Sequence, residues 1–262
     1  MTTAQGRNTS LPDGVAVVIP AKDEQTRIAA TTQAAAALPG VDLVVVVDDG
    51  STDRTAAAAT QVGAVVVGHS RNRGKAAAME TGASVVAAIE SRETGRAGPR
   101  ALLFLDGDLE ATAAKAAPLI VPVLDGSTDM TVATLPAQRS TGGGHGFVVR
   151  LARDGIERAT GWVATQPLSG QRCLTRPAFV AALPLAHGFG VEVGLTIDLL
   201  RQGYRIREVE VPFHHRVTGT DWRSQVHRGR QWLHVARALA TRGVPPVRLP
   251  EGLPIPGRGR RH

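Results

Sequence analysis

The sequence predicts an α/β fold in which helices flank a mostly parallel central sheet. Apolar runs of strand length alternate with alanine-rich stretches of helix length through the first half of the chain. The apolar runs are continuous, which is typical of strands buried on both faces, and the links between elements are short. Because such sheets bind ligands at the carboxyl ends of their strands, we expect the functional residues in the loops at that edge.

The first half of the chain is expected to supply four strands and three helices. Pro39 and Gly40 end the first helix, and Ser51 could cap the second. The expected strands are Val15–Pro20, Asp42–Asp49, Ala64–Gly68 and Ala101–Asp108, and the expected helices are Asp23–Leu38, Thr52–Gln61 and Gly74–Glu90.

The second half is less regular, and its expected elements are shorter or more polar. Gly203 ends one helix, and the last helix is basic and amphipathic. The expected strands are Thr131–Thr134, Gln171–Leu174 and Arg205–Val211, and the expected helices are Phe147–Thr160, Val191–Arg201 and Trp222–Arg242.

The composition indicates a globular protein with one large or two small domains. The 262 residues are 43% hydrophobic and 20% charged, and no apolar run approaches the ~20 residues that span a bilayer. The single cysteine, Cys173, excludes a disulfide framework and a cysteine-based zinc site within one chain. The first ten residues are polar and lack the apolar region of a secretory signal. We therefore expect a cytoplasmic protein.

The positive charge is concentrated in residues 151–262. The net charge is +7, but the first 150 residues are close to neutral. Such a basic segment favours an anionic partner, which could be a phosphorylated substrate, a membrane surface or nucleic acid. Aromatic residues make up only 3% of the chain, so platforms for stacking bases are poorly supplied and no nucleic-acid partner is expected. Arginine strongly outnumbers lysine, which leaves a codon-usage bias as the plain alternative.

The strongest functional motif is Asp106-Gly107-Asp108, at the end of the fourth expected strand. Two carboxylates one residue apart can direct one or both side chains at a divalent ion, and Mg²⁺ fills the rest of its shell with substrate phosphates. The alternative is a solvated turn. Polar clusters at two other strand ends favour the metal site.

Two further segments suit a nucleotide. Asp48 to Asp53 reads DDGSTD, where Gly50 allows a tight turn and a carboxylate could bond a base or ribose. Lys75 lies at a helix start, where its ammonium and the helix dipole together would suit a diphosphate. An ordinary capped turn and a solvated charge are the respective alternatives.

The second half carries three weaker signals. His215, in a His-His-Arg run, is a plausible metal ligand at a strand end or a surface residue. Glu192 lies among glycines and apolar residues, which favours a buried hydrogen bond, although an acid also suits a helix N-terminus. The glycine-rich run at 142–146 could form a lid.

Four linked motifs resemble the family-2 nucleotide-sugar glycosyltransferases. The motifs are VVIPAKDE, VVVVDDGSTD, NRGKAAAM and FLDGDLE, over about residues 15–110. The resemblance continues more loosely through PLSGQRCLTR, GFGVEVGLTIDLL and VPFHHR, which look most like dolichyl-phosphate glycosyltransferases and glucosyl-3-phosphoglycerate synthases. It implies a GT-A fold with a Rossmann-like nucleotide-binding half, and a hexosyltransferase that uses Mg²⁺ or Mn²⁺ to stabilise the nucleoside-diphosphate leaving group.

The resemblance also implies residue roles. Asp108 and His215 would hold the metal, and Glu192 would lie at the junction of sugar and acceptor. The implied nucleotide-sugar site consists of Pro20, Ala21, Glu24, Asp49, Ser51, Lys75, Asp106 and Gly107. Arginines in and before the last helix are expected to face the anionic end of the acceptor, because a guanidinium matches phosphate bidentately; these are Arg216, Arg223, Arg228 and Arg230.

Several departures and absences narrow the prediction. Asp23 stands where the family usually has Asn, and the Q-x-x-R-W motif of processive synthases is missing, so transfer of a single sugar is favoured. The missing G-x-G-x-x-G and G-x-S-x-G motifs disfavour a dinucleotide oxidoreductase and an α/β-hydrolase. A sugar-1-phosphate nucleotidyltransferase and a non-catalytic basic module for nucleic acid or membrane remain as alternatives.

The domain prediction follows from these patterns. Residues 14–243 are expected to form one glycosyltransferase domain, with a nucleotide-binding half at 14–110 and an acceptor half at 111–243. A disordered leader at 1–13 and a Pro/Arg-rich tail at 244–262 are expected to flank it. The expected partners are a nucleotide diphosphate-sugar and an acceptor that is either a small phosphorylated metabolite or a polyprenyl phosphate. Peripheral contact with the inner face of the membrane and a homodimer stay open.

Overall fold

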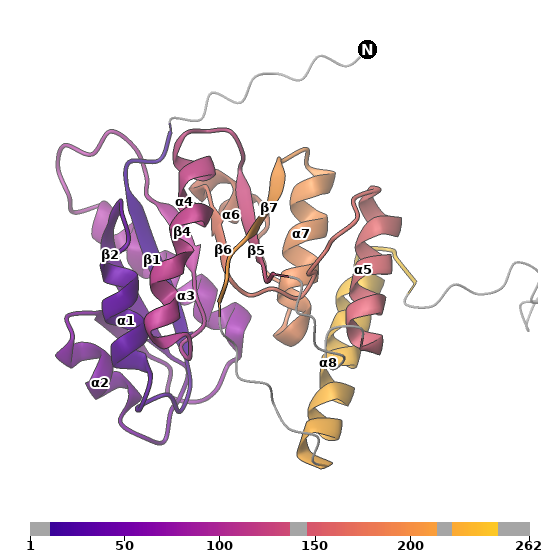
Figure 1. The fold of residues 1–262 in the computed structure, drawn as a ribbon, viewed down its shortest axis with the longest axis horizontal. Coiled ribbons are helices and arrows are strands. Elements are labelled where there is room, and N and C mark those ends of the chain that lie inside the picture. Colours follow the sequence, from indigo (N-terminus) through magenta and orange to yellow (C-terminus); the bar gives the residue numbers. More distant parts are fainter. Residues whose placement is uncertain (1–10, 137–145, 214–221, 246–262) are drawn as a thin grey trace, which may run out of the picture.

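The computed structural model describes residues 11–136, 146–213 and 222–245, and these build a single seven-stranded sheet with helices around it (Figure 1). The strand order is β3-β2-β1-β4-β6-β5-β7. The strands are β1 (Val15–Ala21), β2 (Val41–Asp48), β3 (Val65–Gly68), β4 (Ala101–Phe104), β5 (Met130–Thr134), β6 (Arg172–Leu174) and β7 (Ile206–Glu210).

The sheet is mostly parallel, as the sequence predicts. β1 pairs in parallel with β2 and β4, β2 with β3, and β5 with β7. The exception is β6, which runs antiparallel to both of its neighbours, β4 and β5. This short strand therefore joins the strands of the two halves of the chain into one sheet.

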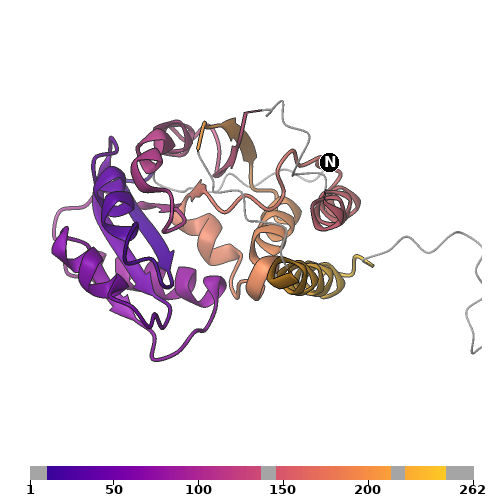
Figure 2. The same ribbon diagram turned by 60° about the horizontal axis from the view of Figure 1, so that its bottom comes forward.

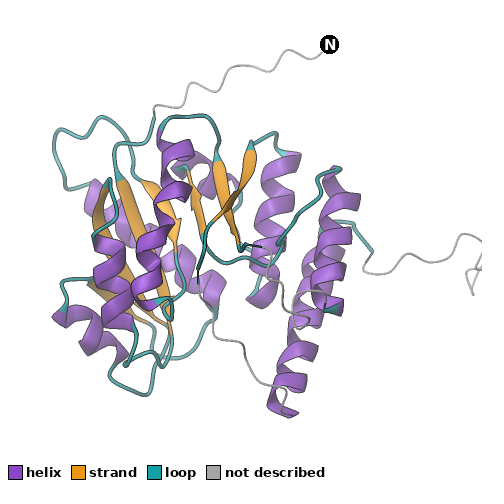
Figure 3. Ribbon diagram, in the orientation of Figure 1, coloured by secondary structure: helices purple, strands orange, loops and turns teal. Residues whose placement is uncertain are grey.

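Helices cover both faces of the sheet, and Figure 3 shows the strands between them. They are α1 (Ile28–Ala36), α2 (Thr55–Gln61), α3 (Lys75–Glu90), α4 (Ala117–Leu124), α5 (Phe147–Thr160), α6 (Arg176–Ala181), α7 (Val191–Arg201) and α8 (Trp222–Ala240), with 3-10 turns η1 (Glu110–Ala116) and η2 (Gly188–Gly190). α1, η1 and α4 pack on one face, α3 and α6 pack on the other, and α5, α7 and α8 enclose a third apolar cluster beside the sheet.

Burial on both faces explains the continuous apolar run of β1. Val15, Val17 and Ile19 belong to the core under α1, whereas Ala16 and Val18 belong to the core under α3. Successive side chains of a strand point to opposite faces, so a strand with two covered faces needs apolar residues throughout. Within the described residues, no helix combines the length and apolar character needed to cross a membrane.

Three boundary predictions were wrong, and local polar bonding explains them. α1 begins at Ile28 rather than Asp23, which has a left-handed φ of 56°. Ser51 does not cap α2, which begins at Thr55; the Ser51 hydroxyl instead accepts the Asp23 N–H at 2.9 Å. Side chains that bond nearby backbone groups compete with helix formation in this way. β4 ends at Phe104, so the acidic motif after it lies in a loop.

Four short elements were not predicted, among them the three-residue turn η2. η1 and α4 follow the acidic motif, and α6 follows β6. α4 contains Pro118 and Pro122, and α6 has only six residues, with Pro177 in its first turn. Helices this short carry little periodic signal. Thr175 caps α6, because its side chain accepts the N–H of Ala178.

Candidate active site

The loops after β1, β2 and β4 meet at one edge of the sheet, because the three strands are parallel neighbours. This edge comes forward in Figure 2. Asp23 joins two of the loops: its N–H donates to Ser51 Oγ at 2.9 Å, and its carboxylate accepts the N–H of Thr52 at 2.7 Å. Hydrogen bonds between backbone N–H groups and side chains therefore hold the loop after β1 against the loop after β2.

Asp49 is a buried acid that fixes the loops at this edge of the sheet. Its carboxylate accepts the N–H groups of Arg73 and Gly74, each at 2.8 Å, and lies 2.7 Å from His69 Nδ1. Burial works to raise the pKa of Asp49, but these hydrogen bonds outweigh it and lower that pKa. Asp49 thus holds the loop that leads into α3. Contact of Asp49 and Ser51 with a base or ribose stays a prediction.

The close contact between the turn after β2 and the loop before α3 requires glycine at position 50. The φ of Gly50 is +71°, and a Cβ added there would lie 2.6 Å from the backbone carbonyl carbon of Arg71. Only glycine combines that backbone conformation with so close an approach of another chain segment. The turn after β2 and the loop before α3 are therefore packed backbone to backbone, which fixes where α3 begins.

Lys75, the first residue of α3, lies between two carboxylates. Its Nζ is 2.7 Å from Asp106 Oδ1, in the loop after β4, and 3.2 Å from Glu192 Oε1, in the first turn of α7. Burial works to lower the pKa of Lys75, but the two negative charges outweigh it and raise that pKa. Three residues that the sequence singled out in separate segments thus form one charged group.

Gln171 completes this group, and sequence reasoning gave it no role. Its amide Nε2 donates to Asp106 Oδ2 at 2.6 Å. We call Lys75, Asp106, Gln171 and Glu192 the active-site cluster. The preceding residue, Gly170, leaves room for Lys75, since a Cβ there would lie 2.3 Å from its Nζ. The only available signal was the position of Gln171 in the PLSGQRCLTR segment, which resembles the family.

Asp108 is exposed next to the active-site cluster. A hydrogen bond and close packing fix the loop that carries it. The carbonyl of the buried Gly107 accepts the Thr31 hydroxyl at 2.9 Å, and a Cβ on Gly107 would contact Ala21 and Glu24, each at 3.4 Å. Burial raises the pKa of Glu24, and the negative charge of Asp108 adds to that rise, although Arg27 opposes it. The charges of Glu24 and Asp108 are therefore close enough to interact at this edge of the sheet. Pro20, near the end of β1, is half-buried.

The remaining predicted residues lie where the structure is not described or is described only in part. His215 and Arg216 lie outside the described residues. Arg223, Arg228 and Arg230 belong to α8, whose backbone is described there, but their side chains are not. Among the side chains that the structure does describe, no group of three or more His, Cys, Asp or Glu residues is arranged to hold a metal ion.

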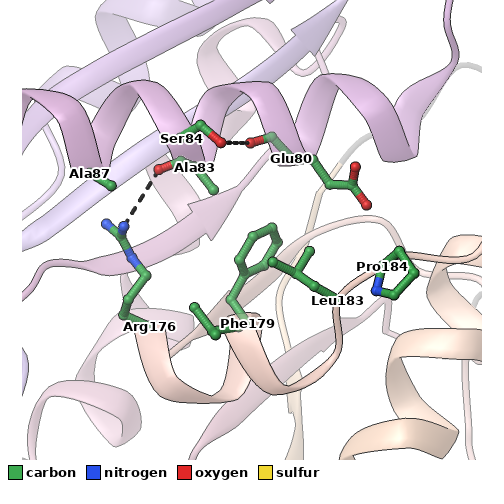
Figure 4. Close-up of a pocket in the computed structure, with 9 residues that line it drawn as sticks. Glu80, Ala83, Ser84, Ala87, Arg176, Phe179, Leu183 and Pro184 are labelled. Carbon is green, nitrogen blue, oxygen red and sulfur yellow. Dashed lines mark hydrogen bonds between the residues drawn. The ribbon is translucent and has the colours of Figure 1, made fainter.

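A groove of about 450 Å³ lies elsewhere, between α3 and α6 (Figure 4). Phe179 and Leu183 supply apolar side chains, and Arg176 at one end donates to the carbonyl of Ala83 at 3.4 Å. None of the predicted site residues lines this groove. It is therefore separate from the edge that carries the polar loops.

Comparisons with known proteins bear on the family and the fold. The family model described as glycosyl transferase family 2 matches residues 16–144. Glycosyltransferase AglJ of Haloferax volcanii is 29% identical over 217 residues, which cover 80% of this chain and 66% of AglJ. Glucosyl-3-phosphoglycerate synthase of Mycobacterium tuberculosis is 30% identical over 200 residues, which cover 70% of this chain and 60% of the synthase. The aligned part thus spans between 60% and 66% of these relatives.

Solved structures of the M. tuberculosis synthase show the same fold. The crystal structure with Mn²⁺, uridine diphosphate and phosphoglyceric acid matches with a TM-score of 0.70 at 26% identity, over 89% of this chain and 80% of that chain. The structure with Mn²⁺, uridine-diphosphate-glucose and phosphoglyceric acid matches with a TM-score of 0.69 at 27% identity. Residues 16–144 belong to the family-2 glycosyltransferases, and the chain has the GT-A fold of the solved synthase.

Proposed function

We propose that this chain transfers one sugar from a nucleotide diphosphate-sugar to a phosphate-bearing acceptor. The observation that carries the proposal is the meeting of Lys75, Asp106 and Glu192 beside the exposed Asp108, at the carboxyl ends of parallel strands. One cation and three carboxylates there suit a substrate that combines a diphosphate, a sugar and a divalent ion.

The donor is proposed to be uridine-diphosphate-glucose in the first instance. The similar M. tuberculosis synthase, which shares the fold over 89% of this chain, has been solved with that donor and Mn²⁺. The proposed nucleotide-sugar site consists of Pro20, Ala21, Glu24, Asp49, Ser51, Lys75, Asp106 and Gly107. Most of these residues flank the joined loops after β1, β2 and β4.

Asp108 and His215 would hold Mg²⁺ or Mn²⁺. The exposed carboxylate of Asp108 is the hard oxygen donor that such ions prefer, and two protein ligands would leave coordination positions for substrate phosphates. When bound, the ion supplies Lewis-acid stabilisation of the departing nucleoside diphosphate. We expect His215→Ala to lower activity in the same direction as loss of Asp108, but less severely.

The residues of this chain orient the reacting groups. Lys75 is held at the N-terminus of α3, where its charge and the helix dipole both favour a phosphate. Asp106 is proposed to face the ribose or sugar, and Glu192 to accept a hydrogen bond from the acceptor hydroxyl. The side chain of Glu192 is only 10% exposed, so water competes poorly for that bond.

The acceptor is proposed to be a small phosphorylated acid, such as 3-phosphoglycerate. The relatives that are synthases of glucosyl-3-phosphoglycerate, and the solved complexes with phosphoglyceric acid, support this choice. A polyprenyl phosphate presents the same phosphate chemistry and is the alternative acceptor. It would require peripheral contact of α8 with the membrane, and that contact, a cytoplasmic location and a homodimer remain proposals.

A thermal-shift screen of nucleotide-sugars, with and without Mn²⁺, tests the proposed function. A true donor at ~100 times its dissociation constant should stabilise the fold by roughly 2.7 kcal/mol. The bound donor is then offered 3-phosphoglycerate or a polyprenyl phosphate, and product is measured by mass spectrometry. Absence of stabilisation by every nucleotide-sugar, with Mn²⁺ present, would overturn the proposal.

A further inference from the structure

Two adjacent buried side chains, Gln171 and Arg172, lie beside the active-site cluster and have no assigned part in the proposed reaction. Only 2% of Gln171 and 1% of Arg172 are exposed. Gln171 ends the loop before β6, and Arg172 is the first residue of that strand. Both lie outside the segment, residues 16–144, that the family model matches.

Gln171 and Lys75 hold the two oxygens of one carboxylate. The Gln171 amide donates to Asp106 Oδ2 at 2.6 Å, and the Lys75 ammonium donates to Asp106 Oδ1 at 2.7 Å. Donors on both oxygens fix the orientation of the carboxylate. The Ser169 hydroxyl, which lies 3.4 Å from Gln171 Oε1, donates to the other end of the amide. The amide nitrogen is therefore the end that faces Asp106.

Arg172 fixes the loop that presents Gln171. Its guanidinium donates to the carbonyls of Ser169 at 2.9 Å and Pro167 at 3.3 Å, and to the Thr196 hydroxyl at 2.8 Å. Thr196 lies one turn after Glu192 in α7, and its hydroxyl also donates to the Glu192 carbonyl at 2.9 Å. Burial lowers the pKa of Arg172 to about 10, so the side chain still carries its proton at neutral pH. One buried cation thus ties the loop to the helix that carries Glu192.

A neutral amide suits this position for an electrostatic reason. Lys75 faces Asp106 and Glu192, and a diphosphate would compete with both carboxylates for its charge. If Lys75 leaves Asp106 to bind the diphosphate, Gln171 still holds Asp106 in place. A neutral amide neither neutralises the carboxylate nor attracts the diphosphate. A second carboxylate at this position would instead have to share a proton with Asp106.

We propose that Gln171 is a positioning residue that holds Asp106 for the donor, and that Arg172 holds the loop that carries Gln171. The inference deepens the proposed function and rests on it. It predicts that a change at Gln171 acts on donor binding more than on the fold or on the acceptor.

The test compares Gln171→Met, Gln171→Glu and the wild type. Gln171→Met keeps the length of the side chain and removes the donor, so the dissociation constant for uridine-diphosphate-glucose with Mn²⁺ should rise about tenfold, with acceptor KM unchanged. Gln171→Glu keeps the shape but replaces the donor that faces Asp106 with a second carboxylate, so its donor affinity should fall below that of Gln171→Met. Calorimetry at neutral pH measures the affinity, and steady-state kinetics measures kcat and KM.

Gln202→Met is the matched control. Gln202 also uses its amide as a donor, but to a backbone carbonyl, that of Ala181 at 2.9 Å, and it is exposed at the end of α7. Donor affinity should not change in this variant. The inference is overturned if wild type and both Gln171 variants bind the donor equally, or if the Gln171 variants lose only thermal stability. A wild type that binds no nucleotide-sugar overturns the proposed function as well, and the two failures are therefore distinguishable.

Discussion

Two charged clusters lie at opposite edges of the sheet, and they differ in how their charges are balanced. In the active-site cluster, at the carboxyl ends of the strands, Lys75 faces Asp106 and Glu192. The Asp106 side chain is 33% exposed, and Asp108, two residues further along the same loop, is exposed. Negative charge therefore exceeds positive charge at a place that a ligand can reach.

The second cluster lies at the amino ends of β2 and β4. Arg100 is 4% exposed and makes paired hydrogen bonds to the carboxylates of Asp42, at 2.7 and 2.9 Å, and Glu93, at 2.8 and 3.0 Å. Arg96 adds contacts to the same two carboxylates at 3.1 and 3.2 Å. We call these four residues the arginine cluster; it contains two cations and two carboxylates.

The difference in charge balance indicates that the arginine cluster serves stability and the active-site cluster serves function. In the arginine cluster each carboxylate is paired inside the protein, so it ties β2, β4 and the end of α3 together and leaves little charge for a ligand. Among the described residues, the active-site cluster has two carboxylates and one cation at an exposed edge, and this excess of negative charge suits a bound cation. Substitutions in the two clusters should therefore have opposite signatures.

The largest effect is expected from Asp108→Ala. Loss of the exposed carboxylate should lower kcat/KM by about three orders of magnitude, because the leaving diphosphate would lose the ion that balances its charge. The thermal midpoint should not change, since Asp108 is not part of the core. Glu110→Gln, a neighbouring exposed acid, is the control and should retain activity. Near-normal turnover of Asp108→Ala would contradict the metal assignment.

Arg100→Met should have the opposite signature. It leaves the carboxylates of Asp42 and Glu93 without their main partner, so the free energy of unfolding should fall by about 3 kcal/mol. Urea titration measures that loss, and the affinity for the donor should be unchanged. Arg92→Met, at an exposed arginine near the end of α3, should cost less than about 0.5 kcal/mol. An Arg100 variant that remains as stable as the wild type would show that the arginine cluster is not what holds this edge.

Glu192→Gln should separate chemistry from binding within the active-site cluster. The amide keeps the shape but accepts the proposed hydrogen bond from the acceptor hydroxyl less well than a carboxylate does, so we expect kcat to fall about a hundredfold with little change in donor affinity. Glu157→Gln, on the surface of α5, is the matched control. If donor binding collapses instead, Glu192 belongs to the donor pocket or to the scaffold, and its proposed place beside the acceptor is wrong.

The two edges of the sheet differ in how much of their structure could be predicted from the sequence. Continuous apolar runs identified the parallel strands, and acidic residues after them identified the loops, because these signals are local. The contact of Lys75 with Asp106 and Glu192 depends on how three distant segments meet, which no local pattern encodes. Gln171 was missed for the same reason, since a buried amide leaves no charge pattern in the sequence. Asp49 shows a further limit. The sequence does not distinguish an acid at a loop start that binds a ligand from one that binds the backbone of the protein itself.

Acid should weaken the fold through the arginine cluster. Burial works to raise the pKa of Asp42, but Arg100 and Arg96 outweigh it and lower that pKa; hydrogen bonds from the same arginines lower the pKa of Glu93. A lowered pKa in the folded state means that the stabilisation is complete above the unfolded pKa, about 4, and is lost as pH falls through the folded value. Unfolding in urea between pH 6 and 3 should therefore show a steeper loss for the wild type than for Arg100→Met. Parallel curves would contradict this.

The smallest effect is expected from substitutions in the basic helix α8, which should affect only the acceptor. Arg228 and Arg230 are proposed to face the anionic end of the acceptor, because a guanidinium matches phosphate bidentately. Reversing both charges to Glu should raise the acceptor KM three- to tenfold, roughly the effect of one or two exposed ion pairs, and leave donor affinity unchanged. Reversal of Arg92 and Arg207, which are exposed on other elements, makes the same change in net charge and should not alter the KM.

Vesicles that contain anionic lipid distinguish the two acceptors in the same pair of variants. Attraction of a basic segment to such a surface is worth about 1 kcal/mol per residue, so a helix that docks on lipid should lose binding when two charges are reversed. Binding that weakens only in the α8 variant would favour a polyprenyl phosphate. A raised KM for 3-phosphoglycerate without vesicle binding would favour the small acceptor. If neither measurement responds, the positive charge of α8 plays no part in acceptor recognition, and the excess of arginine reflects composition alone.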